Sequence, residues 1–246
     1  MSAAPLRVLY EDEALVIVDK PPKVLVHRSA LSPQDYPLMW TLRDQIGRWV
    51  YPAHRLDRAT SGAIAFTTSP EHARALALSF ERREVEKRYW ALTRGYAPDE
   101  AEVHIPLKEP LDEIADALAD PNKGAQEAHT SARCLARVEL PIAVGRYPTT
   151  RYSLVEAIPH TGRRHQIRRH LHHLTHPIIG DTSYGRTEHN RLFRESFSCD
   201  RLLLAAVSLT VPHPVTGAHI TARAPLSGDF ERVVRALFPA LSLTLP

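Results

Sequence analysis

The apolar positions at the start of the chain alternate in a way that predicts a β-hairpin. Residues 6–10 and 14–18 are rich in β-branched and apolar side chains, and the acidic residues 11–13 separate them. The second strand should end at the Lys-Pro-Pro of residues 20–22, because proline cannot donate to the hydrogen-bond ladder. A short strand is expected next, at residues 24–27.

Apolar side chains at helical spacing predict the helices. Ser69 and Pro70 are typical of a helix start, since serine caps free N–H groups and proline needs no donor at the first helical position. Ala73, Leu76 and Phe80 then lie on one face. The other expected helices are 41–50, a short piece carrying Ile114, Ala115 and Leu118, an amphipathic segment carrying Ile167, Leu171 and Leu174, and 229–238.

Runs of β-branched and aromatic residues predict further strands. They cover residues 63–67, 86–93, 130–139, 151–158, 202–211 and 218–224. Strands therefore dominate and the helices are scattered between them, which favours an α+β fold built on a mixed sheet.

Composition indicates the size and the compartment. The chain has 246 residues, of which 43% are hydrophobic and 24% charged, and this is typical of a soluble globular protein. Nowhere do about 18 apolar residues run together, so neither membrane insertion nor export is expected. The two cysteines, Cys134 and Cys199, lack Cys-x-x-Cys spacing, which argues against a disulfide framework or a zinc ribbon. We therefore expect a protein of the reducing cytoplasm.

Positive charge is concentrated in one segment. The net charge is only +3, but residues 163–176 contain four arginines, five histidines and no acid. Residues 109–120, in contrast, are acidic. A basic segment in a nearly neutral chain is typical of a local phosphate-binding face.

The strongest chemical signal is a carboxylate between two arginines. Residues 53–62 read AHRLDRATSG, with Asp57 flanked by Arg55 and Arg58. The neighbouring positive charges should favour the ionised carboxylate. Such a group can attack carbon as a nucleophile or stabilise a cationic sugar, and arginines suit a polyanionic substrate. A structural ion pair in a loop would also explain an isolated Arg-x-Asp-Arg.

Two further basic segments point to RNA. Lys87 and Arg88 precede Tyr89 on an expected strand, where an aromatic side chain otherwise only packs against its neighbours. Residues 160–168 read HTGRRHQIR, so a glycine interrupts the chain before a basic helix. Backbone N–H and guanidinium groups at such a helix start suit a phosphate chain. A solvated helix face is the ordinary alternative for a run of arginines.

The histidines of residues 165–176 do not form a recognisable metal-binding pattern. His172 and His176 are four residues apart, but there is no His-Glu-x-x-His, no thiolate partner and no acid before Asp181. Pro177 also predicts that the helix has ended by His176. We interpret these histidines as polar surface that contacts RNA or solvent. The Gly-x-Ser-x-Gly elbow of a hydrolase is also missing.

Three motifs together resemble one enzyme family. Residues 54–62 are similar to His-Arg-Leu-Asp-x-x-Thr-Ser-Gly, the active-site motif of the RluA-type pseudouridine synthases. Residues 87–89 match the Lys-x-Tyr of that family, and residues 161–168 match its Thr-Gly-Arg-x-His-Gln-Ile/Leu-Arg. The resemblance extends from about Leu6 to the last strands. It implies an α+β fold with a mixed central sheet in two halves, flanking helices and a central cleft.

The resemblance also implies roles for individual residues. Asp57 matches the catalytic nucleophile, Tyr89 the tyrosine that stacks on the target base, and Arg168 the arginine that pairs with the aspartate. Arg55 matches the arginine that fills the space left by the flipped base, and Leu203 or Leu204 is expected to form an apolar floor. The remaining expected RNA-binding residues are Arg58, Lys87, Arg163, Arg164 and Arg169. No cofactor and no metal are expected.

Segments outside the motifs resemble a branch of the family that modifies uridine 65 in the T/acceptor region of tRNA. These segments are residues 25–29, 43–47, 144–152 and 176–181. We therefore expect tRNA as the partner of a monomer with no protein partner. We also expect one catalytic domain over residues 1–246, without an N-terminal S4 RNA-binding domain.

One position departs from the family, and three other functions stay open. Many relatives have Leu-His-Ala where residues 204–206 read Leu-Ala-Ala, so any contact of that histidine cannot be assumed. A ribosomal RNA pseudouridine synthase would share the core motifs. An N-glycosidase would use the same carboxylate and release the base to water. An RNA-binding protein with a vestigial cleft fits less well, since Asp57, Tyr89 and Arg168 are all intact.

Overall fold

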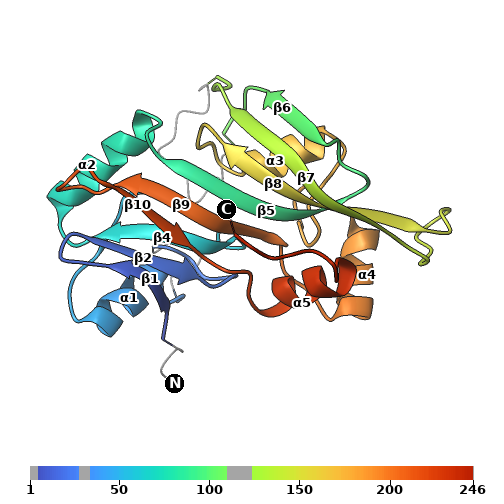
Figure 1. The fold of residues 1–246 in the computed structure, drawn as a ribbon, viewed down its shortest axis with the longest axis horizontal. Coiled ribbons are helices and arrows are strands. Elements are labelled where there is room, and N and C mark those ends of the chain that lie inside the picture. Colours follow the sequence, from blue (N-terminus) through green and yellow to red (C-terminus); the bar gives the residue numbers. More distant parts are fainter. Residues whose placement is uncertain (1–4, 28–33, 110–123, 246) are drawn as a thin grey trace.

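A ten-stranded mixed sheet forms the centre of the protein, as a computed structural model shows for residues 5–27, 34–109 and 124–245 (Figure 1). The strand order is β1-β2-β4-β9-β5-β8-β7-β6, with β10 beside β9 and β3 beside β4. The strands are β1 (Arg7–Glu11), β2 (Leu15–Lys20), β3 (Tyr51–Pro52), β4 (Ser61–Thr67), β5 (Glu86–Arg94), β6 (Glu100–His104), β7 (His129–Leu140), β8 (Thr150–Pro159), β9 (Leu204–Pro212) and β10 (His219–Arg223). The helices are α1 (Leu38–Ile46), α2 (Pro70–Glu81), α3 (Gln166–His173), α4 (Thr187–Phe197) and α5 (Gly228–Leu237).

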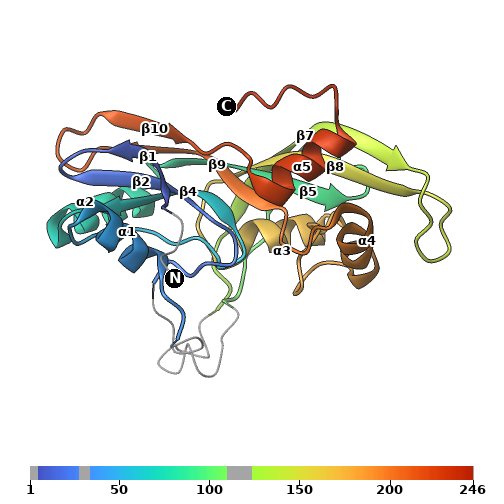
Figure 2. The ribbon, with the colours of Figure 1, turned by 90° about the horizontal axis from the view of Figure 1, so that it is seen from below.

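The two faces of the sheet are covered by different helices. Along β2, Val16 and Val18 join a core cluster with α1 and α3, whereas Leu15 and Ile17 join a cluster with α2. This alternation follows from the pleat, which sends successive side chains to opposite faces. A third cluster packs α4 and α5 against β5, β8 and β9. In Figure 2, α3 is drawn below strand β5, and α5 is drawn above α3.

One pairing joins the two halves of the sheet. β4 and β9 run parallel, with Ser61 opposite Ala205 and Gly62 opposite Ala206, while the other pairings are antiparallel. A side chain at Gly62 has no room, because an added Cβ would lie 2.2 Å from the carbonyl oxygen of Ala206. The backbone at Gly62 also has a φ of 108°, which favours glycine. The glycine that ends the Asp57 motif is therefore explained by the close approach of these two strands.

Most of the expected elements are confirmed. All expected strands from residue 63 onward are present, and the Ser69 hydroxyl oxygen accepts the backbone N–H of His72 at 3.1 Å at the start of α2. The amphipathic helix α3 ends at His173, before Pro177 as expected. The expected helix around residues 114–118 lies outside the described residues. No helix in the described part of the chain is long and apolar enough to cross a membrane.

Two expectations near the N-terminus are wrong. Residues 24–27 form no strand, because the carbonyls of Leu25 and Val26 accept the backbone N–H groups of Leu38 (2.8 Å) and Met39 (3.2 Å) instead. They cap α1, whose N-cap residue is a proline without a side-chain acceptor. The expected helix 41–50 is displaced, since α1 covers 38–46 and ends at a left-handed glycine. Strands β3 and β6 and helix α4 were not predicted from the sequence.

Candidate active site

A cavity of about 500 Å³ lies between the loop before β4, the strands β5 and β9, and helix α3. Its wall includes residues 54–57 and Thr60, the start of β5, the segment 159–168 and Leu204. Leu204 therefore forms part of an apolar wall, whereas Leu203 packs in the cluster with α4 and α5. Of the two residues named as alternatives for the apolar floor, Leu204 is the one that lines the cavity.

Asp57 lies in the loop between β3 and β4, and its side chain is 23% exposed toward the cavity. The backbone N–H of Thr60 donates to the carbonyl of Asp57 at 3.1 Å and closes a turn. The following residues enter β4 directly. The carboxylate is thus fixed at the end of a central strand, where its backbone is held by the sheet.

Lys20 donates a hydrogen bond to the loop that carries Asp57. The side chain is fully buried, and Nζ donates to the carbonyls of Pro21 (2.9 Å) and Arg58 (3.1 Å). Burial, together with the positive charge of Arg201, lowers the pKa of Lys20 to about 7. The sequence suggested only the end of a strand at this position.

Replacing Lys20 with methionine should change how stability depends on pH. The pKa falls from 10.5 in the unfolded chain to about 7 in the folded protein. Between these values the unfolded chain binds a proton that the folded protein does not, so the Lys20 contribution to stability falls as pH falls. We expect the free energy of unfolding of Lys20→Met to gain on the wild type from about pH 10 to about pH 7, by at most about 1.4 kcal/mol per pH unit. Urea unfolding across this range measures it, and a pH-independent difference would contradict the expectation.

Arg168 connects Asp57 to a second, buried carboxylate. Its Nη1 lies 3.4 Å from Asp57 Oδ2, while Nε and Nη2 donate to the two oxygens of Asp181 at 2.7 and 2.8 Å. Asp181 Oδ1 also accepts the backbone N–H groups of Ser183 (2.9 Å) and Tyr184 (3.0 Å). Burial alone would lower the pKa of Arg168, but hydrogen bonding and charge from Asp181 outweigh it and raise that pKa. Arg168 is therefore a permanent cation whose direction is set by Asp181.

Gln166 fixes the segment that precedes α3. Its amide oxygen accepts the Thr161 hydroxyl (2.7 Å) and the Arg163 backbone N–H (3.0 Å). Its amide nitrogen donates to the His129 carbonyl and to the Thr130 hydroxyl, both at 2.9 Å. A buried amide with four satisfied hydrogen bonds holds one geometry, so it attaches the basic segment firmly to β7.

Tyr89 faces the cavity because of its register on β5. Tyr89 lines the cavity, whereas the next residue, Trp90, packs in the cluster with α5. Burial and then the negative charge of Asp57 raise the pKa of Tyr89 well above its ordinary value. The phenol is thus neutral at neutral pH and can pack against a base or donate a hydrogen bond.

Two further groups near Tyr89 have lowered pKa values. Burial and the charge of Lys87 lower the pKa of His54 to about 3. Its Nε2 lies 3.0 Å from the backbone N–H of Ala65 and accepts it, so the proton of the neutral ring is on Nδ1. Burial lowers the pKa of Lys87 to about 8, and its Nζ donates to the Thr161 carbonyl at 3.4 Å. Lys87 therefore belongs to the cavity wall and not to an exposed strand surface.

The structure brings most of the expected site residues together and places two outside the cavity wall. Those that line the cavity are Arg55, Asp57, Lys87, Tyr89, Arg163, Arg164 and Arg168. Arg58 pairs with Asp35 at 3.0 Å, and Arg169 donates to the Lys108 carbonyl at 2.7 Å. Arg168 is a cation beside the Asp57 carboxylate, whereas Arg58 pairs with Asp35.

The interpretation of the histidines as polar surface is wrong for part of the segment. His172 and His173 are exposed, but His170 is buried, with Nδ1 2.9 Å from the Thr130 hydroxyl. His165 lines the cavity, and its Nε2 lies 3.9 Å from Asp57 Oδ2. Helix α3 packs against β7 and β8, so only one of its sides faces outward.

Several site residues could not be assigned from the sequence. One of them, Asp181, binds Arg168, and another, Lys20, donates to the carbonyl of Arg58 in the Asp57 loop. Two more, His54 and His165, line the cavity. Asp181 had one usable signal, since it is a single acid directly after the apolar run of residues 177–180. The substituted position, Ala205, pairs with Trp90 and packs in the cluster with α5. The position at which many relatives have a histidine therefore does not line the cavity in this protein.

The sequence from the N-terminal hairpin to the end of α3 matches one protein family. The family described as RNA pseudouridylate synthase matches residues 14–173, which contain both Asp57 and Arg168. The chain belongs to the RNA pseudouridylate synthase family. It is 49% identical over 230 residues to a tRNA pseudouridine synthase C of Pectobacterium carotovorum subsp. carotovorum, across 93% of this chain and 61% of that protein. The chain thus spans about three fifths of that relative.

Two further similarities agree with this family. A tRNA pseudouridine synthase C of Vibrio cholerae is 51% identical over 222 residues, which are 90% of this chain and 91% of that protein. The structure of Human RNA Pseudouridylate Synthase Domain Containing 4 superposes with a TM-score of 0.68 at 23% identity, over 93% of this chain and 92% of that one. The pseudouridine synthase fold expected from the sequence motifs is confirmed.

Proposed function

We propose that this protein converts a uridine of tRNA to pseudouridine, with Asp57, Tyr89 and Arg168 as its catalytic residues. The observation that carries the proposal is the Asp57 carboxylate, which opens to the cavity beside the Arg168 guanidinium. The names of the similar proteins from Pectobacterium and Vibrio support tRNA as the substrate. A cavity of about 500 Å³ is of the size that holds one small ligand, such as a single nucleotide.

The proposed reaction rearranges bonds within one nucleotide. Asp57 attacks C1′ of the ribose or removes a proton from the sugar, and the bond from C1′ to N1 of uracil breaks. The uracil turns in the cavity and C5 bonds to C1′. At this step the bond between Asp57 and C1′ breaks or, on the other route, the sugar regains the proton that Asp57 removed. The proton on C5 is then lost while N1 gains one. The product has the same atoms as the substrate, so the reaction requires no oxidant, reductant or second substrate.

The target base must leave its stack to reach Asp57, which costs a few kcal/mol. Arg55 is proposed to enter the space that the base vacates, and its exposed position in the cavity wall supports this role. Tyr89 is a neutral phenol and supplies an aromatic surface for the flipped base. Arg168 holds the Asp57 carboxylate in one direction through the chain of contacts that ends at Asp181.

We propose uridine 65 in the T/acceptor region as the modified position. We expect deletion of the gene to remove one tRNA pseudouridine from this region and to leave ribosomal RNA unchanged. Chemical mapping of pseudouridines in total RNA with and without the gene measures this. Loss of a ribosomal site with an intact tRNA profile would support the ribosomal alternative. Release of free uracil by the purified protein would instead indicate an N-glycosidase.

Binding of tRNA should depend steeply on salt through the basic segment. Arg163 and Arg169 donate to backbone carbonyls, which leaves their positive charges without a carboxylate at those contacts. We expect Arg164→Gln with Arg169→Gln to lower the slope of log affinity against log salt by about one to two. A matched control is Arg232→Gln with Arg235→Gln on α5, which removes the same charge elsewhere. Equal slopes for both variants would mean that the RNA lies on another surface.

A further inference from the structure

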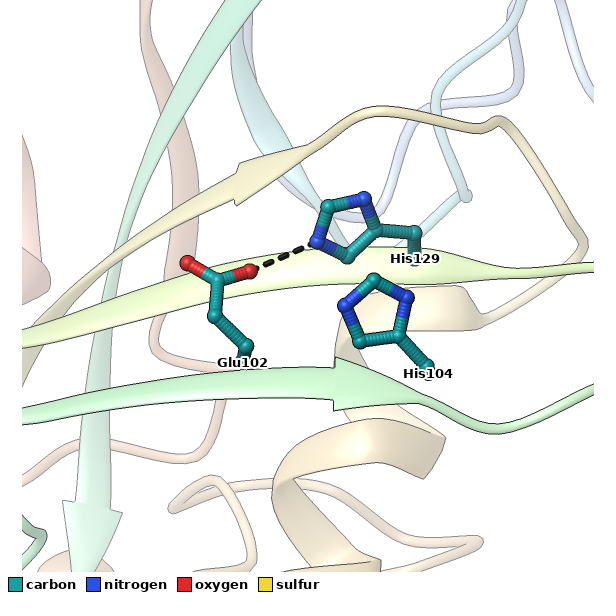
Figure 3. A group of neighbouring side chains, drawn as sticks. All are labelled: Glu102, His104 and His129. Atoms are coloured by element: carbon teal, nitrogen blue, oxygen red, sulfur yellow. Dashed lines mark hydrogen bonds and ion pairs between the residues drawn. The ribbon is translucent and has the colours of Figure 1, made fainter.

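Strands β6 and β7 carry a group of imidazole and carboxylate side chains outside the cavity wall (Figure 3). Glu102 and His104 are two residues apart on β6, so the pleat places them on one face of the sheet. His129 on β7 lies directly opposite His104 in the antiparallel register. One potential ligand atom of each residue lies within 4.8 Å of the other two.

Direct contacts already hold two of these side chains together. Glu102 Oε2 lies 2.6 Å from His129 Nε2, and the rings of His129 and His104 stack with centroids 3.9 Å apart. In Figure 3 both rings turn a nitrogen toward the Glu102 carboxylate. Two imidazole nitrogens and one carboxylate oxygen therefore converge on a single region above the two strands.

We propose that Glu102, His104 and His129 bind a divalent transition-metal cation of the Zn²⁺ type. Imidazole nitrogens favour zinc, nickel and copper, whereas Mg²⁺ and Ca²⁺ favour sites made of oxygen atoms. Bonds of about 2.0–2.2 Å in tetrahedral geometry place neighbouring ligand atoms about 3.3 Å apart. Ligand atoms that lie within 4.8 Å of one another must therefore come closer by rotation of side chains, and Glu102 and His104 are exposed and have room to rotate.

The surrounding contacts are those that orient metal ligands. The Ser131 hydroxyl donates to Glu102 Oε2 at 2.9 Å, and the His129 carbonyl accepts the Gln166 side-chain amide at 2.9 Å. The backbone N–H of His129 donates to the Thr161 hydroxyl at 3.0 Å. The backbone of His129 is thus held by Thr161 and Gln166, which also line the cavity.

The cation would take the place of a shared proton. When the His129 ring carries its proton on Nε2, this N–H donates to Glu102 Oε2 across the 2.6 Å contact. With the neutral ring protonated on Nδ1 instead, Nε2 has a free lone pair for the cation, and no proton leaves the protein. The Glu102 carboxylate supplies the negatively charged ligand of the three. Three protein ligands leave a fourth position for water or an anionic oxygen.

The test is a titration of metal-free, untagged full-length protein with Zn²⁺ by calorimetry, and with Co²⁺ by visible absorption. We expect one equivalent in the tightest class of sites and a tetrahedral Co²⁺ spectrum. His104→Ala and Glu102→Gln should each lower the Zn²⁺ affinity of this site at least about tenfold. His104→Cys keeps a zinc ligand at this position and should retain tight Zn²⁺ binding. His219→Ala is the matched control, since it removes an exposed strand histidine on β10.

Two results would overturn the proposal. Absence of saturable Zn²⁺ binding by the wild type is one, and unchanged affinity in both His104→Ala and Glu102→Gln is the other. Thermal melting of each variant without metal shows whether a loss of binding reflects a loss of folding. The titration contains no RNA, so its outcome does not depend on the proposed modification of tRNA.

Discussion

Asp57→Asn should abolish pseudouridine formation while leaving tRNA binding nearly intact. Asparagine keeps the size of the side chain and the turn closed by Thr60, but it removes the charge and the nucleophile. We expect turnover to fall by roughly three orders of magnitude or more, as when a covalent catalyst is lost. Tritium release from C5-labelled uridine in tRNA measures turnover, and filter binding measures affinity.

Binding should survive this change because phosphate contacts supply most of the affinity. The Asp57 carboxylate is one negative charge in a cavity whose wall carries Arg55, Arg163 and Arg164. The matched control is Asp200→Asn, which removes an exposed carboxylate that pairs with Lys23 outside the cavity wall. Its turnover should equal that of the wild type. Substantial turnover by Asp57→Asn would exclude this carboxylate as the reacting group.

The sequence was most informative where local chemistry decides the structure. The Ser69 cap and the strand patterns from residue 63 onward could be recognised from neighbouring residues alone, and these predictions are confirmed. The Asp57 motif identified one end of the site, and its glycine is explained by the approach of Ala206. The pairing of Asp57 with Arg168 came from the family resemblance, and the 3.4 Å contact between them agrees with it.

Long-range contacts account for most of what the sequence did not reveal. Lys20 is buried because the loop after Asp57 lies over it, which no pattern around residue 20 indicates. Helix α4 is largely polar and buries only Leu192 and Phe193, so its periodic signal is weak. Residues 24–27 form no strand because the carbonyls of Leu25 and Val26 accept N–H groups at the start of α1. These donors lie more than ten residues further along the chain, so the local pattern does not reveal them.

The acid that orients Arg168 was also not assigned, and this changes how Arg168 should be tested. Asp181 makes the shorter hydrogen bonds to Arg168, at 2.7 and 2.8 Å, whereas the contact of Arg168 with Asp57 is 3.4 Å. The Asp181 side chain is fully buried. Loss of Arg168 therefore affects folding as well as the site.

Arg168→Met should lose both activity and stability, and a second substitution should restore only the stability. Methionine leaves Asp181 as a buried charge without its cation, which costs about 3–5 kcal/mol of the free energy of unfolding. Combining Arg168→Met with Asp181→Asn removes that charge, while the amide oxygen of asparagine still accepts the N–H groups of Ser183 and Tyr184. We expect urea unfolding to show recovery of most of the lost stability in the double variant.

Turnover should stay low in that double variant, because no guanidinium then orients the Asp57 carboxylate. Tritium release by Arg168→Met with Asp181→Asn should therefore match that of Arg168→Met at a temperature where both are folded. Addition of Asp57→Asn should lower turnover little further, since residues that act as a unit are not additive. Recovery of activity together with stability would show that Arg168 serves only to neutralise Asp181. Recovery of stability alone assigns Arg168 to the positioning of the reacting carboxylate.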